Sequence, residues 1–300
     1  MLTPEQLAMR KTMLTATDLV KLAGVHPLGR GAHDVYTDKV GDAHEEVASE
    51  TAATIGNRLE PIALGMLAEK IGRVITRGVT ERHPILTWLG ATPDGNVLAE
   101  PGGSRIAVAE AKAVGFRLAH HWTDADDGLP EYVQIQVQAQ MIVTRTRAAH
   151  VVAIVGTELR TYEVEHDDDL AGALLTLGER FWTRHVLARV APTPDGSESA
   201  RKMLLAAWPR HRAELLPADA YAEDWASEYL AAKAAEEEAR SRKERAQQLL
   251  CARIADAEGI AGKGWKATWK ATAPVEVRGF TRAASRTFRF SQVKAKGEAA

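Results

Sequence analysis

The run RIAVAEAKAV, residues 105–114, constrains the fold of this chain more than any other stretch. Its apolar residues occupy both alternating sides, which is typical of a strand that is buried on both faces of a sheet. The same run carries Glu110 and Lys112, and residues i and i+2 of a strand point to one side. Charged groups on such a strand are costly unless they pair or bind something. The run therefore predicts a covered sheet with a charged pair that is a candidate functional site.

A second acid precedes this strand. Asp94 lies in the stretch GATPDGNV, sixteen residues before Glu110. If GNVLAEPGGSRIAV folds as a hairpin, Asp94 and Glu110 come together at one sheet edge. Two carboxylates suit Mg²⁺, and a lysine beside them could orient or help deprotonate an attacking water, as in phosphodiester hydrolysis. From these residues alone, a turn aspartate (TPDG recurs at 193–196) and a structural Glu110–Lys112 ion pair are the favoured alternative.

Helical and strand-like patterns alternate over the first 190 residues. They predict a capped short helix in TATDLVKLAG, a long helix over 44–72 bent at Pro61, short strands over 73–112, a strand pair in AAHVVAIVG and LRTYEVE, and a helix over 167–190. The order of elements indicates an α/β domain over residues 1–190.

The remaining residues differ in composition. Residues 191–200, APTPDGSESA, have the composition of a linker, and 201–260 are expected to form a helical, coiled-coil-like arm centred on 221–256. Residues 261–300 are expected to form a small basic β element, with a strand at Trp265–Lys270. Nine basic residues against two acidic ones give residues 263–300 a charge of +7 and leave the rest at −9. A polyanionic partner and a solvated basic tail explain this asymmetry equally well.

The single cysteine, Cys251, excludes an internal disulfide, a CxxC zinc site and a four-cysteine iron–sulfur cluster, and it fits a reducing compartment. The sequence shows no signal-peptide pattern and no uninterrupted apolar run near 18 residues. We therefore expect a cytoplasmic protein, in the host cell if it is viral, that does not act in a membrane.

Five stretches in order carry a family resemblance: LTATDLVKLAGVHPLG, GNRLEPIALGMLAEKIG, GATPDGNV, AEAK and PEYVQIQVQAQMIVT. Together, over about residues 10–190, they resemble the YqaJ-type viral recombinase (lambda exonuclease-like) family of PD-(D/E)xK nucleases. The resemblance implies a restriction-endonuclease-like core, a central mixed β-sheet flanked by helices. It also implies a Mg²⁺- or Mn²⁺-dependent DNA exonuclease that degrades duplex ends from 5′ to 3′ in phage-type recombination. An endonuclease on the same core and a non-catalytic DNA-binding or scaffold protein remain alternatives.

The resemblance also assigns the catalytic residues. Asp94 matches the motif aspartate, Glu110 and Lys112 match the ExK pair, and Glu60 matches a helical acid that completes the metal site. The backbone carbonyl of Ala111 is implied as a further metal ligand. Nothing local singles out Glu60, so its assignment depends on the resemblance alone.

The resemblance further implies a grip on a terminal 5′-phosphate by Arg10 and Thr17, where this chain has Thr in place of the family's Ser. The alternative is a surface arginine and a helix cap at Thr17. The implied partners are duplex DNA ends and a single-strand annealing protein, and the implied oligomer is a trimer.

The stretch YVQIQVQAQMIV alternates like a half-exposed strand, whereas the family has a helix there. We expect the helix, because Tyr132, Gln136 and Gln140 would then line one face toward the site, with Gln136 as the catalytic glutamine and Tyr132 contacting DNA. Solvent-facing glutamines are the alternative. His120 and His121 with nearby aspartates more readily form a polar loop than a second metal site. Trp265 and Trp269 could stack on bases, although the buried side of a small sheet is the favoured interpretation.

Overall fold

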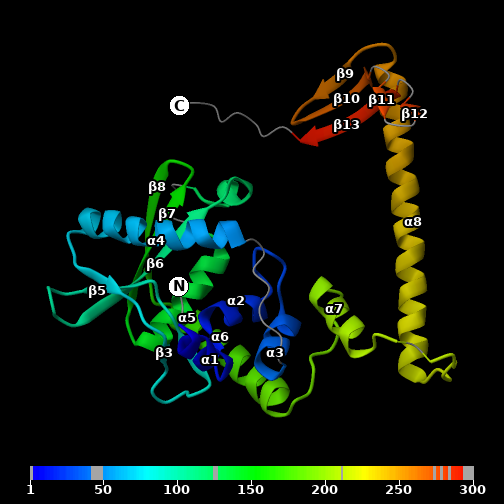
Figure 1. Cartoon of the computed structure of the whole chain (residues 1–300). Coiled ribbons are helices and arrows are strands. Elements are labelled where there is room, and N and C mark those ends of the chain that lie inside the picture. The colour runs from blue at the N-terminus through cyan, green and yellow to red at the C-terminus, as the bar shows by residue number, and fades with distance from the viewer. Residues whose placement is uncertain are drawn as a thin grey trace. The chain divides into compact units, whose positions relative to one another are not determined.

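The computed structural model describes residues 3–41, 50–123, 128–210, 212–272, 275–277, 280–282 and 285–292. The chain divides into two compact units, residues 1–211 and 212–300 (Figure 1). The first unit holds the mixed β-sheet and most of the helices. It also includes residues 191–211, so the expected boundaries at 190 and 200 fall within it.

The core of the first unit is a five-stranded mixed sheet in the order β2-β5-β6-β7-β8. The parallel pair β6–β7 sits at its centre, and the other neighbours are antiparallel. The bounds are Ile75–Arg77 for β2, Gly95–Leu98 for β5, Arg105–Val114 for β6, Ala148–Val155 for β7 and Glu158–Glu165 for β8. The expected strand over 105–114 and the expected pair over 148–165 are therefore confirmed.

A smaller sheet, in the order β1-β4-β3, joins distant parts of the first unit. It consists of Leu14–Thr15 (β1), Leu89–Ala91 (β4) and Glu81–Arg82 (β3). β1 pairs parallel with β4. This pairing ties the N-terminal segment to the chain just before Asp94.

Helices cover both faces of the central sheet, which explains why β6 is apolar on both sides. Ala63 and Leu67 of α4 (Glu50–Ile71) pack on Ala107 and Ala109, whereas α5 (Glu131–Thr144) packs on Val108. In Figure 1, α4 crosses the sheet next to β6. The helix α4 continues through Pro61, and the expected residues 44–49 lie outside the described part. The two faces of β6 thus belong to two separate apolar clusters.

The remaining elements of the first unit complete its helical layers. They are α1 (Pro4–Lys11), α2 (Ala16–Leu22), α3 (Ala32–Val40), the 3₁₀ helix η1 (Phe116–His121), α6 (Asp168–Phe181), the π-helix η2 (Trp182–Leu187) and α7 (Glu198–Ala207). The predicted short helix is confirmed as α2, but its N-cap is Thr15, whose hydroxyl accepts from the Asp18 amide. A cap at Thr17 is therefore wrong.

The helix expected for YVQIQVQAQMIV is confirmed as α5, and it is buried almost all round from Val137 to Thr144. Gln138 donates to the Glu165 carbonyl at 2.7 Å and accepts from the Asp167 amide at 3.1 Å. Solvent-facing glutamines are thus wrong for the second half of this helix, because its polar side chains have buried partners.

The second unit consists of α8 (Ala220–Ile254) and short strands. The strands are β9 (Gly259–Gly262), β10 (Trp265–Thr272), β11 (Val275–Val277), β12 (Phe280–Arg282) and β13 (Ser285–Gln292). The long helix and the Trp265 strand are confirmed. Ala267 of β10 is fully buried, whereas Lys266 and Lys270 are exposed. The face of β10 that carries Trp265, Ala267 and Trp269 is therefore the buried face of this strand. In the described part of the chain, no helix is long and apolar enough to cross a membrane.

Candidate active site

The hairpin β5–β6 brings the predicted acids together. Gly95 pairs with Ala109, which places Asp94 one step beyond the ladder and beside Glu110. The Ala111 amide donates to Oδ2 of Asp94 at 2.8 Å, which fixes this carboxylate against β6. Gly78 backs the loop from the other side, because a Cβ there would lie 1.9 Å from the Pro93 carbonyl oxygen. Any side chain at position 78 would therefore displace the loop that carries Asp94.

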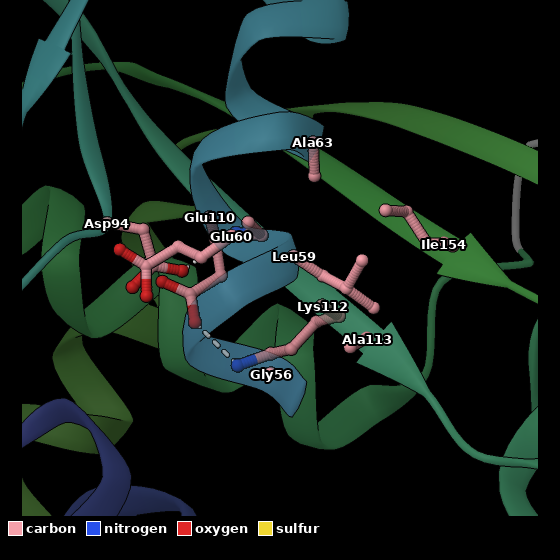
Figure 2. Close-up of a pocket in the computed structure, with 10 residues that line it drawn as sticks. Gly56, Leu59, Glu60, Ala63, Asp94, Glu110, Lys112, Ala113 and Ile154 are labelled. Atoms are coloured by element: carbon pink, nitrogen blue, oxygen red, sulfur yellow. Dashed lines mark hydrogen bonds and ion pairs between the residues drawn. The ribbon is translucent and has the colours of Figure 1, made fainter. Parts of the chain in front are cut away.

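A cavity of about 140 Å³ opens at this edge of the sheet. Figure 2 shows the carboxylates of Asp94, Glu110 and Glu60 close together, with Glu60 on α4, and the Lys112 ammonium directed toward Glu110. The apolar part of the wall comes from Gly56, Leu59, Ala63, Ala111, Ala113 and Ile154. The structure thus brings together the three acids that the resemblance assigned to the metal site and the lysine that it assigned to catalysis.

Glu110 is the most enclosed member of the group, with 2 % of its surface exposed. Its Oε1 accepts from the Lys112 ammonium at 2.5 Å and from the Gln136 amide at 2.6 Å. Its Oε2 accepts from the fully buried Gln140 at 2.6 Å. Lys112 also donates to Oε1 of Gln136 at 2.9 Å. The buried carboxylate is therefore fully hydrogen-bonded in an arrangement that uses two turns of α5.

Burial and the neighbouring charges shift the pKa values of Asp94 and Lys112. Burial, the nearby Glu110 carboxylate and Glu60 raise the pKa of Asp94 well above 3.8, despite the opposing effects of Lys112 and the Ala111 amide. Burial alone would lower the pKa of Lys112, but Glu110 and Asp94 together outweigh it and raise that pKa above 10.5. The Glu110 and Asp94 carboxylates therefore favour the ammonium form of Lys112 in the metal-free protein.

The donor chemistry of the cavity fits a hard divalent cation. Three carboxylates face it, and their mutual repulsion is of the kind that a bound cation relieves. Nevertheless, in the described ranges no three Asp, Glu, His or Cys side chains converge closely enough to enclose a metal ion. The oxygens of Glu110 are instead occupied by Lys112, Gln136 and Gln140. Glu60, Asp94, Glu110 and the Ala111 carbonyl are the residues that would hold the metal.

Two of the three predicted DNA-contacting residues, Arg10 and Tyr132, lie near this centre. Arg10 donates to the Thr92 hydroxyl at 3.3 Å, two residues before Asp94. Thr17 is half-buried in the first turn of α2. The Tyr132 ring packs edge-on against Trp122 at 6.5 Å, and burial raises the pKa of its phenol while Lys112 opposes that shift. Arg10 and Tyr132 thus flank the acidic cluster, whereas the phosphate grip itself stays a prediction.

Two further features bear on the site. Gln140 was on the predicted polar strip but was not among the predicted catalytic residues; its i+4 spacing from Gln136 was the available signal.

His120 and His121 are exposed in η1, and residues 124–127, which hold the aspartates of the alternative metal cluster, lie outside the described part. The two histidines are not among the residues that line the acidic cavity.

A buried ion network supports the Arg10 segment. Lys39, with 1 % of its side chain exposed, contacts Asp18 and Asp38 at 2.8 Å each and donates to the Arg10 carbonyl at 2.9 Å. Burial opposes ionisation of Asp18, but Lys39 and Lys21 lower its pKa to about 2. This network fixes the end of α1 to α2 and α3.

A mixed sheet with an aspartate beside one hairpin strand and Glu-x-Lys on the next defines the restriction-endonuclease-like class with a PD-(D/E)xK arrangement. Residues 5–147, just under half of the chain, match the YqaJ-like viral recombinase domain. The predicted family and fold class are thus confirmed. The match includes Glu60, Asp94, Glu110, Lys112, Gln136 and Gln140, whereas Ile154 of the cavity wall lies beyond it.

Solved structures share this fold. The structure of LHK-Exo in complex with dAMP is 22% identical with a TM-score of 0.53, over 63% of this chain and 94% of that one. The structure of an alkaline exonuclease (LHK-Exo) from Laribacter hongkongensis is 20% identical with a TM-score of 0.51, and the match covers 69% of this chain and 100% of that one. At these identities the likeness shows a common fold. No curated protein matches the chain by sequence.

Proposed function

We propose that this chain is a divalent-metal-dependent deoxyribonuclease that hydrolyses phosphodiester bonds from the ends of duplex DNA, in the 5′ to 3′ direction. The observation that carries the proposal is the convergence of Glu60, Asp94, Glu110 and Lys112 on one cavity within a YqaJ-like domain. The exonuclease structures that share the fold support the same activity.

In this proposal each residue has a separate task. Glu60, Asp94, Glu110 and the Ala111 carbonyl hold Mg²⁺ or Mn²⁺, whose positive charge stabilises the scissile phosphate and activates the attacking water when it is bound. Lys112, as an ammonium, donates to the developing negative charge or to the water. Gln136 and Gln140 hold Glu110 in place. Lys112 thus acts as a charged donor rather than as the base considered from sequence.

The proposed preference for the phosphorylated ends of duplex DNA depends on Arg10 and Thr17 of the N-terminal segment. Arg10 projects near Thr92, on the approach to Asp94, and a guanidinium suits bidentate binding of a terminal phosphate. Thr17 would add a hydroxyl donor, and Tyr132 would contact the nucleotide beside Lys112. The product single strand would pass to an annealing protein, and a trimer would enclose the duplex.

Digestion of duplex DNA with Mg²⁺ tests this function. Linear 5′-phosphorylated duplex should be degraded fastest, linear 5′-hydroxyl duplex more slowly, and covalently closed circles not at all. Cleavage of circles would replace the proposal with an endonuclease on the same core. If no substrate is cut with Mg²⁺ or Mn²⁺ while DNA still binds, the chain is a non-catalytic DNA-binding or scaffold protein.

A further inference from the structure

The indole of Trp122 is a buried group that the proposed mechanism does not use. Trp122 directly follows η1, and 2 % of its surface is exposed. It packs in the apolar cluster that α5 and β7 share, together with Val133 and Val137. Its Nε1 is buried, and within the described ranges no acceptor lies in hydrogen-bonding geometry with it. Because a buried indole N–H usually has an acceptor, the surroundings of this atom need an explanation.

Tyr132 is the aromatic neighbour on one side of Trp122. The two rings meet edge-on, with centroids 6.5 Å apart and planes at 81°, which is a favoured arrangement of aromatic rings. Burial raises the pKa of the Tyr132 phenol, and Lys112 and the Trp122 indole both oppose that shift. The phenol oxygen is therefore the polar group that the buried Nε1 approaches.

Tyr132 also lies next to the lysine of the acidic cavity. Tyr132 and Gln136 are one turn apart on the same face of α5. Gln136 accepts a hydrogen bond from the Lys112 ammonium at 2.9 Å. A displacement of the Tyr132 ring would therefore change the surface that a nucleotide meets beside Lys112.

Trp122 is itself held by a different element. Arg160 of β8 donates to the Trp122 carbonyl, and the Tyr162 hydroxyl donates to the Thr123 carbonyl at 2.6 Å. The Tyr162 ring packs against the indole with the centroids 5.9 Å apart. Since these contacts come from β8, the position of the indole does not depend on Tyr132, and the indole can support that ring.

We propose that Trp122 is a positioning residue whose indole holds the Tyr132 ring beside Lys112, where Tyr132 contacts the nucleotide. The inference rests on the proposed nuclease function and adds to it a residue from outside the acidic cavity. Trp122 itself touches neither the metal nor the DNA. Its effect on DNA must therefore pass through Tyr132, whereas a residue that only stabilises the core would act regardless of that ring.

A double-mutant cycle on DNA affinity tests this dependence. The full-length chain binds a fluorescent 5′-phosphorylated duplex with Ca²⁺ in place of Mg²⁺. Tyr132→Ala should weaken binding by about 5-fold or more, the scale of one lost contact between an aromatic ring and a base. Trp122→Leu should weaken binding by a similar factor, and the double variant should lose no more than the larger single effect. Factors that multiply, or wild-type affinity in either single variant, would overturn the inference.

Two further variants separate positioning from loss of stability. Trp122→Met fills more of the buried volume without a ring, and it takes the place of Trp122→Leu if thermal melting shows that the latter is unfolded. Val155→Ala lies in the same apolar cluster, on β7, and should lower the Tm while DNA affinity stays unchanged. A comparable loss of DNA affinity in Val155→Ala would show that any weakening of the cluster has this effect, and would overturn the positioning role.

Cleavage with Mg²⁺ separates the inference from the proposed function. Single-turnover cleavage at saturating enzyme should change by less than about 3-fold in Trp122→Leu, because the reacting groups keep their places. A loss of cleavage with unchanged affinity would overturn the inference. Wild-type protein that binds DNA without cutting it would instead remove the nuclease function, and the cycle on affinity would still decide whether Trp122 acts through Tyr132.

Discussion

Gln140 donates a hydrogen bond from Nε2 to Oε2 of Glu110 at 2.6 Å, in a contact that is buried from both sides. The two residues come from different elements, α5 and β6, and neither can move without leaving a buried polar atom unpaired. Through this bond the helix α5 sets the orientation of the carboxylate that faces the acidic cavity.

Replacement of Gln140 by Leu should therefore weaken metal binding. Glu110 would lose its donor to Oε2, and loss of a group that orients a metal ligand typically costs about 10- to 100-fold in metal affinity or activity. Calorimetric titration with Mn²⁺ measures the effect. Gln138→Leu on the same helix is the matched control, because Gln138 bonds to Glu165 and Asp167 instead; it should lower thermal stability without a comparable loss of metal affinity.

Replacement of Lys112 by Ala should leave Mg²⁺ and DNA binding in place while cleavage falls by ~10²-fold or more, the scale of a positioned donor. Single-turnover cleavage of a bound linear duplex, with DNA affinity measured in parallel, checks this. Lys70→Ala is the control, because Lys70 bonds to Thr161 outside the cavity. Cleavage by Lys112→Ala at the wild-type rate would remove the lysine from the mechanism.

Asp94→Asn should stabilise the metal-free protein at neutral pH. The pKa of Asp94 is raised in the fold, so its contribution to stability is fully present below the unfolded pKa of about 3.8 and is lost as pH rises through the folded pKa. The neutral amide avoids that loss. Thermal melting should give a higher Tm without metal and no increase on addition of Mg²⁺, whereas the wild type gains. A lower Tm of the metal-free variant would contradict the view that burial and the neighbouring carboxylates disfavour the charged form of Asp94.

Asp18→Asn tests the buried network that holds the Arg10 segment. The pKa of Asp18 is lowered to about 2, so its contribution is present above 3.8 and is lost as pH falls through about 2. The shift corresponds to about 2 kcal/mol at neutral pH. Urea unfolding at pH 7 should show a loss of this size, and the difference from wild type should shrink toward pH 2. An equal difference at both pH values would exclude ionisation of Asp18 as its cause.

The basic C-terminal segment supports one further prediction. Lys263 and Lys266 are exposed, and Lys266 lies on the side of β10 opposite the tryptophans. If this surface contacts phosphates, Lys263→Gln combined with Lys266→Gln should weaken DNA binding and reduce the salt slope by about one per lost contact. Fluorescence anisotropy at several salt concentrations measures both quantities. Unchanged affinity and slope would mean that these lysines serve something else.

The sequence pattern predicted the sheet well because its strands have strong local signals. The strand at 105–114 and the hairpin before it could be predicted from the residues of those stretches alone. Glu60 was different, since α4 meets β6 only through tertiary packing and its sequence has no local mark of function. Glu60 was assigned from the family resemblance alone, and the structure places it in the wall of the cavity with Asp94 and Glu110.

The glutamines of α5 show why pattern alone was insufficient. Alternation of polar and apolar residues normally indicates a half-exposed strand. Here it arises because the helix is buried on nearly every side, so its polar residues point at partners rather than at water. Gln134 bonds to Leu129, Gln138 to the Glu165 strand end, and Gln140 to Glu110. Those partners lie up to 30 residues away in sequence and could not be read from the stretch itself.

The central claim is that the Asp94–Glu110 cluster hydrolyses DNA with a divalent metal. The most direct measurement compares wild type and Asp94→Asn on one 5′-phosphorylated linear duplex, with Mg²⁺, with Mn²⁺ and with EDTA. We predict nucleotide release by wild type with either metal, none with EDTA, and loss of ~10²-fold or more in the variant. Equal hydrolysis by both proteins, or hydrolysis that persists in EDTA, would contradict the account.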